Sequence, residues 1–427
     1  MKRITRMAIP AGIAATALAL SACSSGDDGG SSDGSEGGGT VTLWARDSQS
    51  DFMQELADGF NASHETQVEV TIVTSAEYVQ KFGTAAAGGD APDLASIDLV
   101  YVPYFASVGA LTDISEQVAG LDWADDMSPA HTSQGEYEGG VYSMPFTADV
   151  SVLFYNKDLM AEAGLDPEDP PSSMAELQAA AEAVAAIDDE TFGTAFSGAC
   201  GGCQLFGLAP HVWASGGNML SDDGTQAQFD SAEVTAMLEL YRGLYEAGTM
   251  PELVTTDSGS NAGDAFAQGR VGFYQWGSFY VGNLAEADFE WGIVPISGTD
   301  DGQSAAFAGG DNITIPSGAS NPEGAWEFLE WASGDEGQQV LVDRGQLPIR
   351  MDLIDEIYTP LDERNAVFAD ALATGNVPYS VVENELFNDS NGVWATLLQE
   401  AVFGSGSVAD AQAKAQAAAQ ELIDSAQ

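Results

Sequence analysis

The sequence predicts an α/β fold in which helices cover a mainly parallel sheet. Strand-like and helix-like segments alternate between residues 40 and 97, as such a fold requires. The chain of 427 residues is long enough for two lobes, and 44% of it is hydrophobic, so a large core can be buried. Glycine and proline clusters separate the later segments.

The chain begins with a segment of the export-signal type. Three basic residues precede an uncharged stretch at residues 7–22, which is typical of a secretory signal and short for a membrane span. The residues that end in Cys23, LSAC, resemble the lipobox of bacterial lipoproteins, in which the cysteine thiol is joined to diacylglycerol. We therefore expect a lipoprotein signal peptide at residues 1–22 and a lipid anchor at Cys23. The alternative is an ordinary cleaved signal followed by a chance cysteine.

A tether follows the predicted anchor. Residues 24–39 contain only Ser, Gly, Asp and Glu, a composition that favours a flexible, extended linker. Residues 23–39 would then hold the folded body, from about residue 40, close to a membrane while leaving it free to turn.

The first five elements of the body follow from periodicity. Residues 40–44, 67–73 and 93–97 read as strands, and residues 51–60 and 76–87 read as helices. In parallel sheets ligands bind beyond the carboxyl ends of the strands. This directs attention to the residues after each predicted strand, namely Arg46, Asp47, Gln49, residues 74–78 and residues 98–101.

Four later helices and one long extended run are also expected. A capping-box pattern at residues 173–176 begins a helix that extends to about residue 187. Helical patterns also cover residues 231–247, 322–332 and 408–425, and residues 146–155 read as one extended run.

Several phrases, kept in order along the body, carry a resemblance to one family. They are GGDAPDL (88–94), YSMPFTADVSVLFYNKDL (142–159), WASGGNML (213–220), DAFAQGRVGFYQWGSF (264–279), GGDNITIPSGASNPEGAWEFLEWAS (309–333) and GVWATLL (392–398). The order resembles that of the extracellular solute-binding proteins of ABC-type sugar importers, the maltose-binding-protein-like group. This resemblance implies a two-lobed periplasmic-binding-protein-like fold, with a ligand cleft between lobes that hinge crossings join.

The resemblance also implies where the chain crosses between the lobes. The extended run would cross near residues 147–151, and residues 307–312 would return, with Gly309 and Gly310 absorbing the dihedral changes of a hinge. The first lobe is expected at residues 40–147 and 312–360, and the second at residues 148–311 and 361–427.

The ligand site is carried over from the same phrases. Aromatic rings would stack on the apolar face of a sugar, while carboxylate, amide and guanidinium groups would bind its hydroxyl groups. For Arg350 the alternative is that a scarce arginine satisfies buried carboxylates. The expected ligand-binding residues are Asp47, Asp98, Tyr101, Asp149, Gln204, Phe206, Trp213, Trp276, Phe279, Asp311, Arg350 and Trp394.

Two cysteines remain after the predicted anchor. Cys200 and Cys203 lie in GACGGCQ, and a short local disulfide is the leading interpretation in an exported protein. A redox site and a structural zinc site are the alternatives, although zinc would need two more ligands. The three histidines are widely spread, so no metal site is expected.

The charge balance limits the partners. Of the 12 Lys and Arg residues three lie in the leader, so 66 acidic residues face nine basic ones after processing and the formal net charge is −57. Such a field excludes nucleic acid and anionic membrane surfaces as electrostatic partners. A salt-loving source would explain the acidity, and a merely acidic secreted protein is the alternative.

These observations predict the substrate-binding component of an ABC importer, which captures a neutral sugar or oligosaccharide by hinge closure and delivers it to a membrane permease. We expect no cofactor and no catalysis, a monomer, and a place on the outer face of the cytoplasmic membrane, which the chain contacts only through its lipid. The alternatives are a receptor for glycerol-3-phosphate or a glycerol phosphodiester, a secreted glycoside hydrolase with two carboxylates at a sugar cleft, and an adhesive surface protein.

Overall fold

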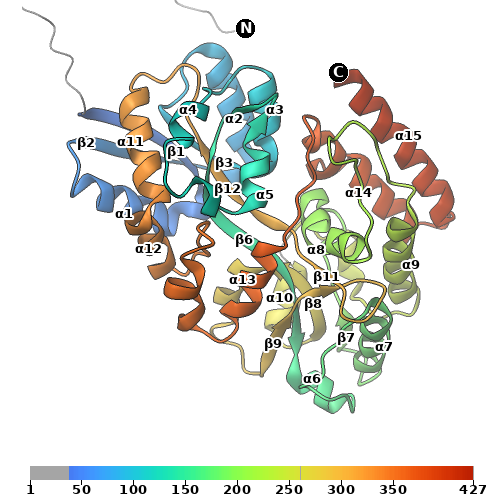
Figure 1. The fold of residues 1–427 in the computed structure, drawn as a ribbon. Coiled ribbons are helices and arrows are strands. Elements are labelled where there is room, and N and C mark those ends of the chain that lie inside the picture. The colour runs from blue at the N-terminus through green and yellow to red at the C-terminus, as the bar shows by residue number, and fades with distance from the viewer. Residues whose placement is uncertain (1–37, 260, 427) are drawn as a thin grey trace, which may run out of the picture. The chain divides into compact units, whose positions relative to one another are not determined.

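The computed structural model describes residues 38–259 and 261–426, which belong to one compact unit (Figure 1). The predicted signal peptide, the anchor Cys23 and almost all of the tether lie outside the described residues. Among the residues described, no helix is both long and apolar enough to span a membrane.

Eight strands form the main sheet, in the order β2-β1-β3-β12-β6-β8-β7, and β9 also pairs with β6. Two small two-stranded sheets, β4–β5 and β10–β11, complete the described strands. The bounds are β1 Gly39–Arg46, β2 Thr66–Val73, β3 Leu94–Asp98, β4 Glu136–Tyr137, β5 Gly140–Val141, β6 Met144–Asn156, β7 Phe192–Thr194, β8 Val271–Gly277, β9 Trp291–Val294, β10 Ile296–Ser297, β11 Ser304–Ala305 and β12 Ala308–Thr314.

The sheet is mixed, which corrects the expectation of a mainly parallel one. β1 runs parallel to β2 and β3, and β7 runs parallel to β8, whereas β12 is antiparallel to β3 and β6, and β6 is antiparallel to β8 and β9. The physical reason lies in the two crossings. β6 leads out of the part of the sheet that contains β1–β3 and β12 leads back into it, so the two strands run in opposite directions side by side.

Fifteen α-helices are described, and they cover the sheet or pack on one another (Figure 1). They are α1 Ser50–Asn61, α2 Ser75–Gly88, α3 Val102–Ser107, α4 Ser115–Val118, α5 Pro129–Gln134, α6 Lys157–Glu162, α7 Met174–Ala185, α8 Gly201–Ala214, α9 Ala232–Glu246, α10 Asn261–Ala267, α11 Pro322–Ser333, α12 Asp335–Asp343, α13 Asn365–Ala373, α14 Val393–Leu398 and α15 Val408–Ala426.

Every element predicted from periodicity is present, within a few residues at each end. The capping residue Ser173 accepts a hydrogen bond from the backbone N–H of Glu176, 3.3 Å away, and so begins α7. Gly89 ends α2 in the left-handed conformation, with φ +77°, which a residue without Cβ adopts at little cost.

β6 is the longest strand of the described chain, and it connects the two parts of the main sheet. Met144–Val150 pair with β12, and Ser151–Asn156 pair with β8 and β9. The β6–β12 register shifts between Asp311 and Asn312. Gly310, just before the shift, has φ +125°, a value that L side chains rarely adopt.

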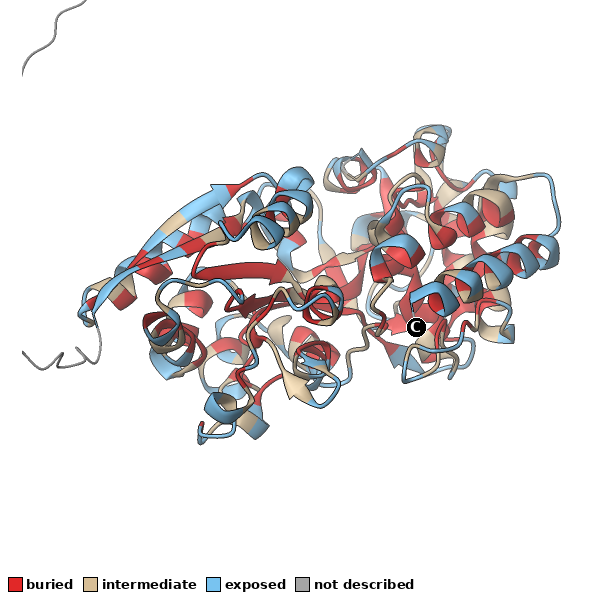
Figure 2. Ribbon diagram, turned by 90° about the horizontal axis from the view of Figure 1, so that it is seen from above, coloured by how far each residue is buried: buried red, intermediate tan, exposed pale blue. Residues whose placement is uncertain are grey.

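Helices that are far apart in sequence pack together beside each of the two parts of the main sheet. α11 and α12 contact α1, whereas α14 contacts α8 and α15 contacts α9, as Figure 1 also shows. The discontinuous lobes expected from the sequence, with their boundaries, stay a prediction. Buried residues line the strands and one face of most helices (Figure 2), and every residue of β6 except Asp149 is buried.

Candidate functional site

A cavity of about 430 Å³ lies where the two parts of the sheet meet. Its lining comes from the ends of β1 and β3, from β6 and β12 at the crossing, from the start of α8, from the end of β8, and from the C-terminal segment at residues 383–388. Segments far apart in sequence therefore build one site.

The sheet register places the polar centre of the cavity. β1 ends at Arg46 and β3 ends at Asp98, and because the two strands are parallel neighbours their carboxyl ends lie together. Asp311 of β12 is the partner of Asp98 in the antiparallel register. As a result Arg46 Nη1 lies 3.2 Å from Asp98 Oδ2, and Arg46 Nη2 lies 2.5 Å from Asp311 Oδ2.

Arg46 stays charged in this setting. Burial acts to lower the pKa of the guanidinium, but the negative charges of Asp311 and Asp98 outweigh it and raise the pKa above its ordinary value. Gln49 links the backbone at Arg46 to β3. Its Oε1 accepts a hydrogen bond from the Arg46 backbone N–H at 3.1 Å, and its Nε2 donates one to Ser96 Oγ at 2.9 Å.

Four acidic residues, which we call the carboxyl cluster, line the same cavity as this single guanidinium. They are Asp98, Asp149, Asp311 and Glu383. Burial, together with the charges of Asp98 and Asp311, raises the pKa of Asp149 to about 7, and Arg46 opposes the rise. Burial also raises the pKa of Asp98, against the charge of Arg46.

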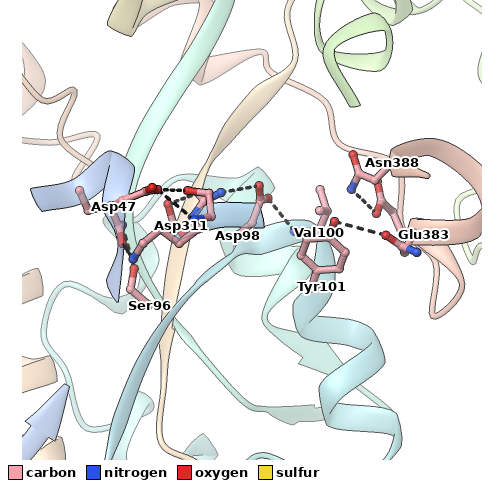
Figure 3. Close-up of polar contacts among 12 residues, drawn as sticks. Asp47, Ser96, Asp98, Val100, Tyr101, Asp311, Glu383 and Asn388 are labelled. Atoms are coloured by element: carbon pink, nitrogen blue, oxygen red, sulfur yellow. Dashed lines mark hydrogen bonds and ion pairs between the residues drawn. The ribbon is translucent and has the colours of Figure 1, made fainter. Parts of the chain in front are cut away.

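Glu383 is the member of the carboxyl cluster that comes from the C-terminal segment. Figure 3 shows Asp98 between Asp311 and Val100, with the Glu383–Asn388 pair beyond Tyr101. Asn388 Nδ2 donates to Glu383 Oε2 at 2.8 Å. Burial, with a smaller contribution from the charge of Asp98, holds the pKa of Glu383 well above its ordinary value.

Four rings form what we call the aromatic wall: Phe206, Trp276, Phe279 and Phe307. The centroid of Phe206 lies 5.2 Å from Phe307, 6.0 Å from Trp276 and 6.1 Å from Phe279. Trp276 is held near the end of β8 opposite Val152 of β6, and Phe279 is 55% exposed. An apolar surface beside a polar cluster suits a ligand that has both a C–H face and hydroxyl groups.

The disulfide predicted between Cys200 and Cys203 is present, and it lies at the start of α8 beside the cavity. Gly202 lies so close to Asn388 Oδ1 that a Cβ would collide with it. Across residues 38–259 and 261–426, no group of three or more His, Cys, Asp or Glu side chains is arranged to hold a metal ion.

Six of the twelve residues expected to bind ligand line the cavity. They are Asp98, Asp149, Phe206, Trp276, Phe279 and Asp311.

Three more of the expected residues lie near the cavity without lining it. Asp47 is exposed and accepts hydrogen bonds from the backbone and hydroxyl of Ser75. Gln204 is buried and donates to the carbonyl of Gly198 at 2.7 Å. The hydroxyl of Tyr101 lies 3.4 Å from Oδ1 of Asn384 in the C-terminal segment.

The remaining three do not line the cavity, although the ring centroid of Trp213 lies 6.0 Å from that of Phe307, and their expected role in ligand binding stays a prediction. Trp213 donates to Asn218 Oδ1 at 3.1 Å. Trp394 has none of its surface exposed, because it packs among Phe229 and Phe387 in the core.

Arg350 is the third residue outside the lining. It makes a two-point ion pair with Asp352, with both N–O distances at 2.7 Å, and its guanidinium lies 5.4 Å from the ring centroid of Trp123. Arg350 itself is buried but its partners Asp352 and Asp335 are exposed, so the placement differs from the alternative given above, an arginine that satisfies buried carboxylates.

Sequence reasoning missed several lining residues. Arg46 follows a predicted strand but is absent from the expected ligand-binding residues, although its place at a strand end and the scarcity of arginine in the chain were usable signals. Glu383 and Asn388 carried no local signal, because tertiary packing alone brings the C-terminal segment to the crossing, whereas Phe307 belongs to the predicted return crossing at residues 307–312.

Comparison with known proteins places the chain among solute receptors. Residues 55–370 match the family model of bacterial extracellular solute-binding proteins. The diacetylchitobiose-binding protein DasA of Streptomyces coelicolor is 27% identical over 350 residues, which are 79% of this chain and 79% of that protein. The maltotriose-binding protein of Pyrococcus abyssi is 23% identical over 328 residues, which are 75% of this chain and 68% of that protein.

Solved structures share the two-lobed α/β fold. The cyclic α-maltosyl-1,6-maltose-binding protein of Arthrobacter globiformis superposes with a TM-score of 0.78 at 25% identity, covering 91% of this chain and 100% of that one. The GacH receptor of Streptomyces glaucescens, which was solved without ligand and with acarbose, gives a TM-score of 0.78 at 24% identity, covering 91% and 99%.

Proposed function

Because the chain belongs to the family of bacterial extracellular solute-binding proteins, we propose that it is the receptor subunit of an ABC importer for a sugar or oligosaccharide. The observation that carries this proposal is the cavity at the crossing, which combines the aromatic wall with the carboxyl cluster and Arg46. The relatives named above for diacetylchitobiose, maltotriose and a cyclic maltosyl-maltose support a saccharide ligand.

The rings and the charged groups would bind different parts of a sugar. A pyranose presents an apolar C–H face, which the aromatic wall can cover, and a rim of hydroxyl groups, which carboxylates and the guanidinium can bind. A phosphate ester fits less well, because Arg46 is the only Lys or Arg in the lining and already pairs with two carboxylates.

Closure of the two lobes on the ligand completes the proposal. The crossings β6 and β12 form the hinge, and Gly309 and Gly310 lie within it. A sugar that contacts both lobes favours the closed state by its differential affinity, and the closed receptor then docks on a membrane permease driven by its ATPase. The receptor acts as a monomer, and its work is capture rather than turnover.

The proposal extends to the export signal. Cys23 carries a lipid that holds the protein at the outer face of the cytoplasmic membrane, and residues 24–39 act as its tether. Replacing Cys23 with alanine should release the protein into the medium. Continued membrane retention of Cys23→Ala, measured by fractionation, would contradict the anchor.

A ligand screen tests the function. We expect a protein of residues 24–427, in molar salt, to gain thermal stability with one series of mono- or oligosaccharides, by about 2.7 kcal/mol at a hundredfold excess over the dissociation constant. The sugars should be recovered unhydrolysed. A shift with glycerol-3-phosphate alone would favour the phosphate-ester alternative, and product formation would show an enzyme.

A further inference from the structure

The cavity is rich in hydrogen-bond acceptors and poor in cations. The carboxyl cluster contributes four acidic groups, whereas Arg46 is the only Lys, Arg or His side chain in the lining. Carboxylates only accept hydrogen bonds, so a ligand that supplies donors and positive charge would complement them.

Arg46 pairs with two members of the cluster, and its Nε is buried without a hydrogen-bond partner. Its Nη1 pairs with Asp98 and its Nη2 pairs with Asp311. In the part of the chain that the structure describes, neither Asp149 nor Glu383 forms an ion pair, and the one hydrogen-bond partner of the Glu383 carboxyl is Asn388. Two acidic groups therefore line the cavity without a counter-ion.

Buried oxygen atoms confirm the imbalance. Asp149 Oδ1, Asp311 Oδ1 and Glu383 Oε1 are shielded from solvent and have no hydrogen-bond partner. Asp311 is 3% exposed and Glu383 is 2% exposed. A buried acceptor or charge without a partner is costly, so a ligand group that donated to these carboxyls would relieve that cost.

The acidity of the whole chain does not explain this cluster. Acidic residues at the surface are solvated and screened by salt, whereas a buried group keeps its desolvation cost. An uncompensated carboxyl can lower that cost by taking up a proton, which agrees with the raised pKa of Asp149 and of Glu383.

We propose that the carboxyl cluster is a subsite for the protonated amine of an amino sugar, so that the pocket prefers a saccharide with a free amine over its acetylated or hydroxyl counterpart. This inference rests on the proposed function, and it replaces the wholly neutral sugar expected from the sequence. An ammonium group brings one positive charge and three donors. A hydroxyl group offers one donor, and an acetamido group offers one N–H donor, and neither carries a positive charge.

Proton release is a second consequence. The charged and titratable groups that face the subsite are Asp98, Asp149, Asp311, Glu383 and Arg46, with Tyr101 beside them. A bound ammonium favours the ionised carboxylates and lowers their pKa, so binding near neutral pH should expel protons. A neutral sugar should leave the carboxyl protons largely in place.

Isothermal titration calorimetry of residues 24–427 tests the inference. The probes are glucosamine, N-acetylglucosamine and glucose, with the disaccharide of each, in two buffers that differ in ionisation enthalpy. We expect the amine form to bind at least about tenfold more tightly than both counterparts, with net proton release. Equal or weaker binding of the amine form, or no binding by any of these probes, would overturn the inference.

Two variants distinguish an effect of the subsite from an effect of the overall negative charge. Glu383→Gln should reduce the ratio of amine to acetylated affinity toward one. Glu421→Gln removes one acid from an exposed position on α15 and should leave the ratio unchanged. An equal loss in both variants would also overturn the subsite. If other saccharides of the wider screen bind but a free amine does not increase affinity, the proposed function stands and the amine subsite is wrong. If no saccharide binds at all, the proposed function and the subsite are both wrong.

Discussion

At the scale of single residues, Asp149 links protonation to stability. Its carboxyl lies beside Asp98 and Asp311, and the cost of burying its charge falls when it takes up a proton. Because the folded-state pKa, about 7, is above the ordinary value of 3.8, the stability that protonation provides is present in acid and is lost as the pH rises through about 7.

Asp149→Asn should remove this pH dependence. Relative to the variant, the wild-type free energy of unfolding without ligand should fall by roughly 2–4 kcal/mol between about pH 4 and pH 8. Urea denaturation across this range measures the difference. A constant difference between the two proteins would show that Asp149 ionises as freely when folded as when unfolded.

Replacing Trp276 and replacing Trp394 should have different effects, one mainly on ligand affinity and the other mainly on stability. Trp276 lines the cavity, whereas Trp394 is fully buried in the core. Trp394→Ala should cost about 3–5 kcal/mol of stability because it leaves a large cavity. Trp276→Ala should cost less stability but weaken sugar binding at least about tenfold, since it removes part of the aromatic wall.

Urea denaturation and calorimetry on both variants check this pair. The account fails here if Trp394→Ala loses affinity at unchanged stability, since that is the behaviour of a ligand platform.

At the scale of elements, the glycines of β12 set the crossing. A Cβ on Gly310 would collide with the carbonyl oxygen of Thr147 in β6, and the φ of +125° is strained for any L side chain. Gly309 approaches Asp149 Oδ1 and Phe206 in the same way. The strand pairing that builds the site therefore depends on residues without side chains.

Gly310→Ala should destabilise the protein by about 3 kcal/mol or more, because it combines backbone strain with a collision inside the β6–β12 pair. Gly318→Ala is the matched control, because Gly318 is exposed and a Cβ there meets no atom within 4 Å. Thermal unfolding of both variants gives the comparison. Similar melting temperatures for the two would contradict the tight crossing.

The elements that the sequence predicted are those with a local signal. Residues 67–73 alternate and residues 51–60 repeat with the helical period, so their patterns survive in β2 and α1. The direction of β12 has no local signal, because pairing with β3 and β6 decides it. Hence the sequence predicted a mainly parallel sheet where a mixed one forms.

The site was predicted in part for the same reason. Residues at strand ends and in family-like phrases, such as Asp98, Asp149 and Trp276, were found because their neighbours in sequence mark them. Glu383 reaches the cavity only through the packing of the C-terminal segment. Trp394 lies in the core, and a tryptophan in a matching phrase gives no information on which way its ring faces in α14.

At the scale of the whole molecule, the excess of negative charge makes stability depend on salt concentration. The chain has 66 acidic and 12 basic side chains, so mutual repulsion opposes the compact state when salt is low. Screening shortens the range of that repulsion from roughly 30 Å at 0.01 M salt to about 3 Å at 1 M.

The melting temperature should therefore rise with salt concentration. Differential scanning fluorimetry in sodium, potassium and choline chloride checks this, and the three salts should act alike at equal ionic strength because the effect is screening. A melting temperature that does not change with salt would contradict the role given to net charge, and a response to one cation alone would indicate a specific ion site instead.

Hinge closure on a saccharide is the central claim, and small-angle X-ray scattering tests it most directly. The radius of gyration of residues 24–427 should be measured free and with the sugar found in the screen, after calorimetry has established saturation. The account predicts a smaller radius with ligand and no change with a sugar that does not bind. An unchanged radius at saturating ligand would contradict a receptor that closes on its cargo.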